Sequence, residues 1–266
     1  MRTICITGSA SGMGAATASR LRERGHRVIG VDVRDAEVVA DLGTAEGRAA
    51  AIAGVESACD GSLDGLATFA GLGPLPGRSG ALLGSVNYFG TIALLEGLRP
   101  QLARGTDAAV VAVSSNSTTC QPAIPHDLID AFLAGDEGRA RALAEEHGSI
   151  NTYPASKIAI ARWVRRHAVG ADWIGAGIRL NAIAPGLIDT PLVAEGMADA
   201  EMAGLLEQFP IPLGRPGRAD ELAALTEFLL GPDAGFFCGS VVWCDGGTDA
   251  LLRTDDWPSI WELPGS

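Results

Sequence analysis

A glycine-rich turn between an apolar run and a helical stretch constrains this chain more than any other feature. Residues 3–7 (Thr-Ile-Cys-Ile-Thr) predict a buried strand, residues 8–14 (Gly-Ser-Ala-Ser-Gly-Met-Gly) a turn, and the alanine-rich stretch after them a helix to about Arg24. Glycine lets the backbone approach a pyrophosphate closely, and the helix N-terminus offers free N–H donors. A tight turn without a ligand would show the same pattern, so the motif needs support from elsewhere.

A carboxylate after the second predicted strand gives that support. Gly25 ends the first helix, residues 27–31 predict a strand, and Asp32 follows, 18 positions after Gly14. A dinucleotide-binding fold places an acid here on the adenosine ribose, where it repels a 2′-phosphate. The turn also lacks Lys and Arg, so the sequence predicts NAD rather than NADP. Asp41 and Leu42 are candidates for covering the adenine, although a solvated loop aspartate would look the same.

Tyr153 and Lys157 lie four positions apart in a stretch of helical character. That spacing places both side chains on one helix face, where the ammonium would favour the phenolate and lower the pKa of Tyr153. A drop of about three units corresponds to roughly 4 kcal/mol and would make the phenol an acid or base near neutral pH. Alone, the pair could equally be a phenol at the edge of the core beside a solvated ammonium.

Composition excludes several classes of protein. A length of 266 residues, 47% of them hydrophobic, fits one α/β domain, and a net charge of -12 disfavours nucleic acid and anionic membrane surfaces as partners. No apolar run is long enough to span a bilayer and no signal peptide is evident, so we expect a soluble, cytoplasmic protein. The five scattered cysteines predict reduced thiols, and the four dispersed histidines predict no metal site.

These motifs resemble the short-chain dehydrogenase/reductase family, whose TGxxxGxG pattern is matched by Thr7, Gly8, Gly12 and Gly14. The resemblance covers nearly the whole chain and implies a single Rossmann-type domain over residues 1–266, with a doubly wound parallel sheet. One departure stands before Ala70 and Gly71, where Thr-Phe replaces the two asparagines of the family's Asn-Asn-Ala-Gly. The hydrogen bonds that tie the central strands together are therefore expected to differ.

Four residues match the catalytic positions of the family: Asn87, Ser115, Tyr153 and Lys157. By resemblance, Tyr153 exchanges a proton with the alcohol oxygen and Ser115 hydrogen-bonds the same oxygen. Lys157 holds the nicotinamide ribose, and Asn87 holds a water of the proton relay. Outside this context an asparagine in a helix could simply bind backbone, and a serine after a strand is commonly a turn residue.

The resemblance also identifies positions that contact the cofactor. Residues 179–186 contain the family's RxNxxxPG, a turn whose backbone lies along the nicotinamide in relatives, and Thr190 matches a residue that contacts the carboxamide. The cofactor-binding set predicted for this chain is Gly8, Ser11, Gly12, Met13, Gly14, Asp32, Asp41, Leu42, Ala70, Gly71, Tyr153, Lys157, Pro185, Gly186, Ile188 and Thr190.

Two segments are expected to shape the substrate side. An insertion at about residues 116–150 precedes Tyr153, and its middle has helical periodicity. We expect it to affect the pocket or a subunit interface, the alternative being a solvated hairpin. Residues 187–212 suit a helical substrate lid, although their apolar side chains would also suit a core helix. The rings of Trp257 and Trp261 are expected to pack on the protein or on a second subunit.

The stretches at residues 30–47, 69–74 and 85–90, together with the long insertion, look like those of bacterial 3α-hydroxysteroid dehydrogenase/carbonyl reductases and coniferyl-alcohol dehydrogenases. This resemblance implies NAD(H)-dependent interconversion of a bulky apolar secondary or aromatic alcohol and its carbonyl, by a homodimer, with a tetramer as the alternative. The alternatives are a coniferyl-type aromatic or terpene alcohol dehydrogenase, a 3-oxoacyl-thioester reductase, which the acidic charge disfavours, and a catalytically silent NAD-sensing protein. Enoyl reductases of the family place their Tyr and Lys farther apart, so the four-residue spacing of Tyr153 and Lys157 argues against that activity.

Overall fold

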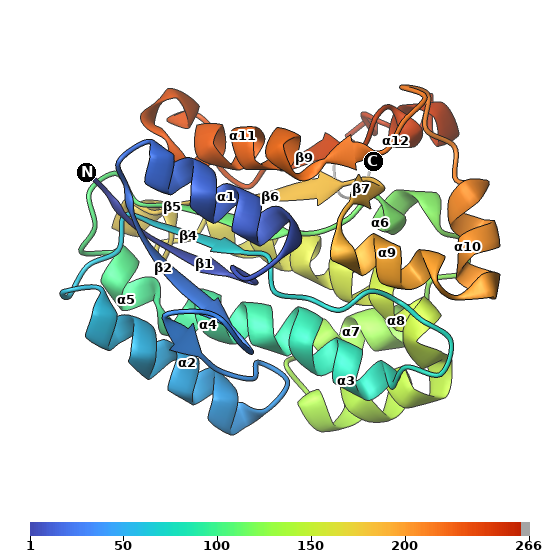
Figure 1. Cartoon of the computed structure of the whole chain (residues 1–266), viewed down its shortest axis with the longest axis horizontal. Coiled ribbons are helices and arrows are strands. Elements are labelled where there is room, and N and C mark those ends of the chain that lie inside the picture. Colours follow the sequence, from blue (N-terminus) through green and yellow to red (C-terminus); the bar gives the residue numbers. More distant parts are fainter. Residues whose placement is uncertain (262–266) are drawn as a thin grey trace.

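Seven parallel strands form the central sheet of the computed structural model, which describes residues 1–261 (Figure 1). The strand order is β3-β2-β1-β4-β5-β6-β9, and each neighbouring pair is parallel. Successive strands are added in opposite directions on either side of the β1–β4 pair, which opens a crevice at the carboxyl ends of the strands. The strands are β1 (Thr3–Thr7), β2 (Arg27–Asp32), β3 (Val38–Val39), β4 (Gly65–Thr68), β5 (Ala109–Val113), β6 (Arg179–Pro185) and β9 (Val241–Cys244).

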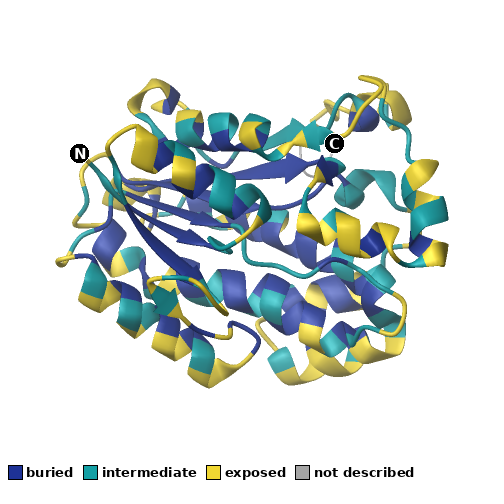
Figure 2. Cartoon of the chain, viewed as in Figure 1, coloured by how far each residue is buried: buried dark blue, intermediate teal, exposed yellow. Residues whose placement is uncertain are grey.

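Helices cover both faces of the sheet (Figure 1). On one face lie α1 (Gly12–Glu23) and α11 (Ala219–Leu230), and on the other α2 (Ala45–Ala58), α4 (Thr91–Gly97) and α8 (Glu137–Ala168). The inner strands between them are almost entirely buried, whereas the edge strands β3 and β9 are only partly covered (Figure 2). Near-continuous apolar runs such as Ala109–Val113 are the pattern of strands covered on two sides. The predicted doubly wound α/β fold is confirmed.

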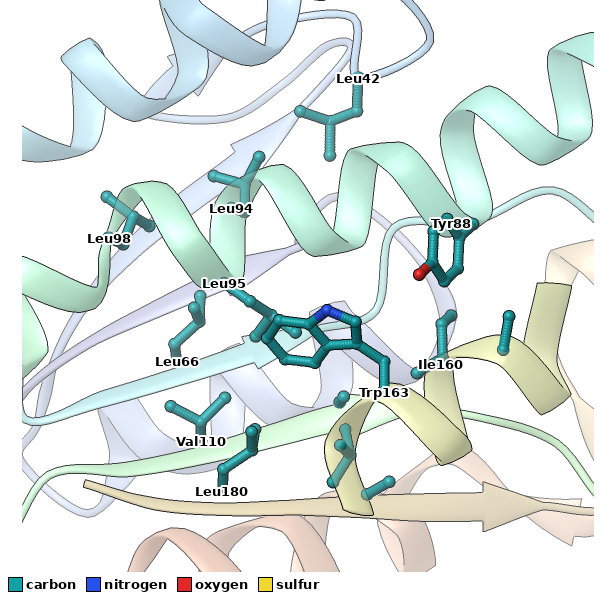
Figure 3. Close-up of a cluster of buried hydrophobic side chains, with 14 of the residues drawn as sticks. Leu42, Leu66, Tyr88, Leu94, Leu95, Leu98, Val110, Ile160, Trp163 and Leu180 are labelled. Carbon is teal, nitrogen blue, oxygen red and sulfur yellow. The ribbon is translucent and has the colours of Figure 1, made fainter. Parts of the chain in front are cut away.

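The larger of the two cores lies between the sheet and α8. Trp163 of α8 points toward the sheet, among side chains from β4, β5, β6 and α4 (Figure 3). A second core lies on the opposite face, between the sheet and the pair α1 and α11. The labelled neighbours of Trp163 include Leu66, Leu95, Val110 and Leu180, each fully buried.

The remaining elements are short and lie at the sheet ends or between its helices. A two-stranded ladder joins β7 to β8, away from the main sheet. The full set of short elements is α5 (Arg99–Leu102), α6 (Ser117–Cys120), α7 (His126–Leu133), η2 (Ile174–Ala176), β7 (Ile188–Asp189), α9 (Pro191–Met197), α10 (Ala200–Glu207), β8 (Gly217–Arg218), η3 (Pro232–Ala234) and α12 (Thr248–Leu252).

The sequence predicts a helix that opens at Ser85 and runs to about Leu98, but in the structure this helix begins earlier, at Gly80. Its first turn, α3 (Gly80–Gly84), is capped by Ser79, whose hydroxyl accepts the Leu82 N–H at 3.1 Å. The helix then widens into the π-helical turn η1 (Ser85–Gly90) before continuing as α4. The two glycines and the absence of a capping box around Ser79 hid this start in the sequence.

The insertion before Tyr153 is helical and packs on the protein. Its helices are α7 and the first part of α8, which Gly148 interrupts at a φ of 72°. The ring of Phe132 is fully buried, 4.9 Å from that of Tyr88. Glu137 accepts two hydrogen bonds, of 3.0 and 2.6 Å, from the buried guanidinium of Arg48. The helical character is confirmed, and the solvated-hairpin alternative does not describe this segment.

Gly80 tests the contact between α3 and the insertion. A Cβ at Gly80 would lie 1.9 Å from the carbonyl oxygen of Ala144, which is backbone and cannot move aside alone. We expect Gly80→Ala to lower the free energy of unfolding by about 1–3 kcal/mol, measured by urea denaturation. The matched control is Gly204→Ala in α10, where a Cβ meets nothing within 4 Å, and which should be neutral or stabilise by about 0.5–1 kcal/mol. Equal stability of the two variants would contradict the packing described here.

Candidate functional site

A cavity of about 860 Å³ lies at the carboxyl ends of the central strands. It is lined by Ser115, Tyr153 and Lys157, but not by Asn87. The lining also contains the whole set of cofactor residues expected from the sequence: Gly8, Ser11, Gly12, Met13, Gly14, Asp32, Asp41, Leu42, Ala70, Gly71, Tyr153, Lys157, Pro185, Gly186, Ile188 and Thr190. The fold thus brings residues from distant parts of the sequence, from Gly8 to Thr190, together around one cavity.

The glycine turn is shaped by close backbone contacts. Gly8 has a φ of 69°, and a Cβ there would lie 2.7 Å from the Ala70 nitrogen. A Cβ on Gly14 would lie 2.1 Å from the carbonyl oxygen of Gly8, so neither position admits a larger residue. Ser11 is the N-cap of α1 and its hydroxyl accepts no capping hydrogen bond. The first N–H groups of α1 are therefore left to the cavity, which fits the pyrophosphate of a dinucleotide.

The carboxylate of Asp32 stands at the end of β2, beside this turn. Its oxygens accept hydrogen bonds from the N–H groups of Ala10, at 3.0 Å, and Val33, at 2.7 Å. Each oxygen keeps a lone pair for a ribose hydroxyl. Asp41 also lines the cavity, but one of its oxygens accepts the Gly43 N–H at 2.8 Å, as a loop aspartate does. Leu42 is almost fully buried and contributes mainly to the core.

Ser115 and Tyr153 meet at the other end of the cavity. The phenol of Tyr153, on α8, lies close enough to the hydroxyl of Ser115, which follows β5, for that hydroxyl to influence the pKa of the phenol. The Ser115 oxygen also accepts the Ser117 N–H at 3.1 Å. Because this oxygen is held by a backbone donor, its proton is available to Tyr153 or to an oxygen atom in the cavity. The two side chains can therefore act on one bound oxygen.

Lys157 is buried one helical turn from Tyr153. Its Nζ lies 5.7 Å from the centroid of the Tyr153 ring and donates a 3.0 Å hydrogen bond to the Val113 carbonyl oxygen. Burial lowers the pKa of Lys157 to about 8. The ammonium is therefore mostly charged at pH 7, but it loses its proton at a much lower pH than a solvated lysine does.

The expectation that Lys157 lowers the pKa of Tyr153 is wrong for this structure. Burial raises the pKa of Tyr153, and the hydrogen bond from Ser115 lowers it only in part. The spacing of the two residues showed that they share a helix face, but it did not show that both are enclosed, and enclosure disfavours the charged form of each. At neutral pH the phenol is protonated.

Asn87 lies behind the cavity wall, in the π-helical turn η1. Its amide accepts the Leu72 N–H at 2.7 Å and donates to the Leu72 carbonyl at 3.0 Å. These contacts are the backbone-binding role that remained open as an alternative. A Cβ on Gly71 would lie 3.2 Å from the Asn87 amide oxygen and 3.9 Å from Lys157 Nζ, so both polar groups reach the same glycine. A role for Asn87 in a proton relay stays a prediction.

Residues at the ends of β4 and β6 form the cavity wall between the glycine turn and the pair Ser115 and Tyr153. The hydroxyl of Thr7 accepts the Ala70 N–H at 3.1 Å, while the buried hydroxyl of Thr68 has no partner among residues 1–261. The strands are thus tied differently where the two asparagines are replaced. A Cβ on Gly186 would lie 2.7 Å from the Cα of Asp245, which explains glycine at the end of the β6 turn.

Sequence reasoning named segments on the substrate side of the cavity but missed most of its side chains. The two segments were the insertion and residues 187–212, and both contribute to the lining. Side chains with no motif to mark them include Asn116, Ser117, Cys120, Gln121, Ile150, Leu192, Met202, Leu206 and Phe209. The only signal for the last four was the Leu- and Met-rich composition of their segment.

Neither a membrane-spanning helix nor a cluster of metal ligands occurs within residues 1–261. No helix in that range has the length and apolar character needed to cross a bilayer. Within the same range no three His, Cys, Asp or Glu side chains are grouped so that they could hold a metal ion.

Known proteins resemble this chain over nearly its whole length. The family model described as Enoyl-(Acyl carrier protein) reductase matches residues 8–249. The 3-alpha-hydroxysteroid dehydrogenase/carbonyl reductase of Comamonas testosteroni is 42% identical, over 95% of this chain and 98% of its own. The coniferyl-alcohol dehydrogenase of Pseudomonas sp. (strain HR199 / DSM 7063) is 31% identical, over 92% and 96%. The crystal structure of the 3-alpha-hydroxysteroid dehydrogenase from Pseudomonas sp. B-0831 complexed with NADH superposes with a TM-score of 0.91 at 45% identity, over 96% of this chain and 100% of that one.

Lys157 is the only lysine of the chain, so its titration can be followed directly. With ¹³C-labelled lysine, the single ε-carbon resonance should titrate with a midpoint near 8 rather than 10.5. Between pH 8 and 10.5 the unfolded chain keeps the ammonium proton of Lys157, whereas the folded protein has lost it. The stability of wild type relative to Lys157→Met should therefore rise by about 3 kcal/mol from pH 8 to 10.5. A midpoint near 10.5, together with a difference in unfolding free energy between wild type and Lys157→Met that does not change with pH, would show that Lys157 is solvated.

Proposed function

This chain belongs to the short-chain dehydrogenase/reductase family, and on that premise we propose that it is an NAD(H)-dependent oxidoreductase interconverting a bulky apolar alcohol and its carbonyl. The observation that carries the proposal is the arrangement of the cavity. Ser115, Tyr153 and Lys157 meet at one end, while the glycine turn and Asp32 stand at the other. Relatives named for dehydrogenase activity, and a relative complexed with NADH, support it.

The protein residues move and hold the proton. A bound nicotinamide supplies the hydride exchange. In the reducing direction the protonated phenol of Tyr153 gives its proton to the substrate oxygen, and in the oxidising direction the phenolate takes it back. The hydroxyl of Ser115 donates to the same oxygen as negative charge develops there. The Lys157 ammonium offsets the charge left on Tyr153, which matters because the surroundings are buried.

The remaining predicted positions fit NAD. The first N–H groups of α1 would hold the pyrophosphate, and Asp32 the adenosine ribose hydroxyls. A 2′-phosphate would place negative charge against Asp32, with no Lys or Arg in the turn at residues 8–14 to offset it. Pro185, Gly186, Ile188 and Thr190 would line the nicotinamide side, and Asn87 would support Lys157 across Gly71.

The lining of the substrate side favours an uncharged apolar substrate. The only charged residues that line the cavity within residues 1–261 are Asp32, Asp41 and Lys157. A hydroxysteroid or similar ketone fits such walls, and a coniferyl-type or terpene alcohol is the second candidate, since a relative is named for coniferyl alcohol. An acyl-carrier-linked thioester is disfavoured by the net charge of -12. A silent NAD-sensing protein would not need Ser115, Tyr153 and Lys157 together.

We also propose that the enzyme is a cytoplasmic homodimer. The loop at residues 235–239 lies against the end of α8, where Cys238 Sγ donates to the Ala168 carbonyl at 3.4 Å. Phe236 is fully exposed in this loop, and Val169 and Phe228 add partly exposed apolar surface. Exposed apolar side chains of this kind suit a subunit contact. Trp257 lies 6.1 Å from Trp243, while Trp261 is 77% exposed, so its partner stays a prediction.

A substrate panel tests the proposal. Purified protein and NAD would be mixed with 3α-hydroxysteroids, coniferyl-type alcohols, monocyclic terpene alcohols and a 3-hydroxyacyl thioester, and NADH formation followed by absorbance. We expect turnover with one of the first three groups. If no compound gives NADH formation, while NADH binding is still seen by fluorescence, the result would favour the NAD-sensing protein instead.

Tyr153→Phe tests the proton step. The variant keeps the ring and loses the hydroxyl, so it should lose activity by at least about 10²-fold while the Kd for NADH stays near that of wild type. Tyr88→Phe is the matched control, because Tyr88 is the only other tyrosine and is buried in the core away from the cavity. Retained turnover in Tyr153→Phe would remove this phenol from the chemistry.

Asp32→Asn tests the cofactor assignment. Removing the negative charge should weaken NAD and improve NADP, so the ratio of their kcat/KM values should fall by about tenfold or more. Asp35→Asn changes the net charge equally but lies outside the cavity lining, and it should leave that ratio unchanged. If Asp32→Asn and Asp35→Asn had the same ratio of kcat/KM for NAD over NADP, the contact of Asp32 with the ribose would be refuted.

A further inference from the structure

Asn116 is a polar residue of the cavity wall that the proposed chemistry does not use. It directly follows Ser115, lines the cavity and is only 4% exposed. Its backbone is held firmly: the N–H donates to the Pro185 carbonyl at 2.9 Å, and the carbonyl accepts the Thr119 and Cys120 N–H groups at 3.0 Å. The position of its Cβ is therefore set by neighbouring elements, and only the amide is free to turn.

That amide lacks a partner. Within residues 1–261 the side-chain nitrogen of Asn116 is buried and makes no hydrogen bond. The hydroxyl oxygen of the adjacent Ser117, which also lines the cavity, is in the same state. Buried polar groups in folded proteins are almost always paired, so two neighbouring exceptions at a cavity wall call for an explanation. Both atoms have almost no accessible surface, so in this structure they face the protein behind the wall, and a ligand group meets the amide NH₂ only after the side chain turns. A turn about χ2 lets the amide present either its NH₂ or its oxygen.

The neighbouring wall limits what that partner can be. Among the described lining residues, Asp32 and Asp41 stand at the adenosine end and Lys157 is held by Val113. No other charged side chain borders the substrate side in that part of the chain. A carboxylate placed against Asn116 would lose its hydration without gaining a cation, whereas a hydroxyl or carbonyl group would exchange one hydrogen bond for another.

We propose that Asn116 is a specificity-determining residue that binds a second, uncharged oxygen of the substrate, a hydroxyl or carbonyl group separate from the one that reacts. The proposal rests on the proposed function and deepens it. The preferred substrates are neutral alcohols and ketones with two oxygen functions, and simple monofunctional ketones are poorer substrates because they leave the amide unpaired.

Matched ketones test this assignment in the NADH-dependent direction. Cyclohexanone is the reference, and 2-hydroxycyclohexanone and cyclohexane-1,4-dione place a second oxygen beside or across the ring. Comparing wild type with Asn116→Leu, which has a similar shape and no amide, cancels the intrinsic reactivity of each ketone. For at least one oxygenated ketone we expect the preference in kcat/KM over cyclohexanone to fall by about tenfold in the variant. The Kd for NADH, measured by fluorescence, should change less than threefold.

A second arm tests the uncharged character of the site. Wild type should prefer 4-oxocyclohexanecarboxamide to 4-oxocyclohexanecarboxylate by at least about tenfold in kcat/KM. Gln121→Leu is the control variant, since the Gln121 side-chain nitrogen already donates to the Ile150 carbonyl at 3.1 Å. It should leave the preference for a second oxygen intact.

Three results would overturn the inference. They are equal effects of Asn116→Leu on all the ketones, loss of the preference in Gln121→Leu instead, and preference for the carboxylate. A weakened Kd for NADH in Asn116→Leu, with an unchanged ketone preference, would assign the amide to the cofactor and overturn it as well. Failure to reduce any ketone in the wild-type protein would instead count against the proposed function, so the two failures are distinguishable.

Discussion

Two reciprocal hydrogen bonds between the end of β5 and α8 hold together the groups for which we propose a catalytic role. The Ser114 hydroxyl donates to the Lys157 carbonyl at 2.9 Å, and the Lys157 ammonium donates to the Val113 carbonyl at 3.0 Å. Both bonds are buried, where no water competes for them. Ser115 is the next residue of the strand end and Tyr153 lies one turn before Lys157. The contact between their hydroxyls is therefore a consequence of how the strand and the helix are joined.

The same burial sets the electrostatic character of the site. It raises the pKa of Tyr153 and lowers that of Lys157, so each group is pushed toward its neutral form. A charge that moves between such groups is screened less than it would be in water. One ammonium lies 5.7 Å from the centroid of the phenol ring, and no second cation lines the cavity in residues 1–261. Enclosure therefore acts on both groups of the proposed proton transfer, and it is one reason for proposing an uncharged substrate.

The parts of this structure that were predictable are those that local physical rules determine. Gly8, Gly14 and Asp32 are tied to a strand, a tight turn and a helix N-terminus, and sequence order alone locates them. The pKa of Tyr153 was mispredicted because it depends on burial by elements distant in sequence. The start of α3 was missed because Ser79 caps a helix that opens with glycine. Asn116 could not be found at all, since only the folded cavity shows that its side-chain nitrogen has no partner among the described residues.

The insertion forms part of the cavity wall next to the residues proposed for catalysis. Its first turn, α6, is tied to the C-terminal helix, where the Thr119 hydroxyl donates to Asp249 at 2.5 Å. Gln121 is tied to Ile150, just before the reacting tyrosine. The wall bearing Asn116 and Cys120 is held by contacts of the insertion and also by the end of β6, where the Asn116 N–H donates to the Pro185 carbonyl. Ser115 is joined to the same wall, since it follows β5 and accepts the Ser117 N–H. The residues proposed for recognition and for proton transfer are therefore neighbours in the fold as well as in the sequence.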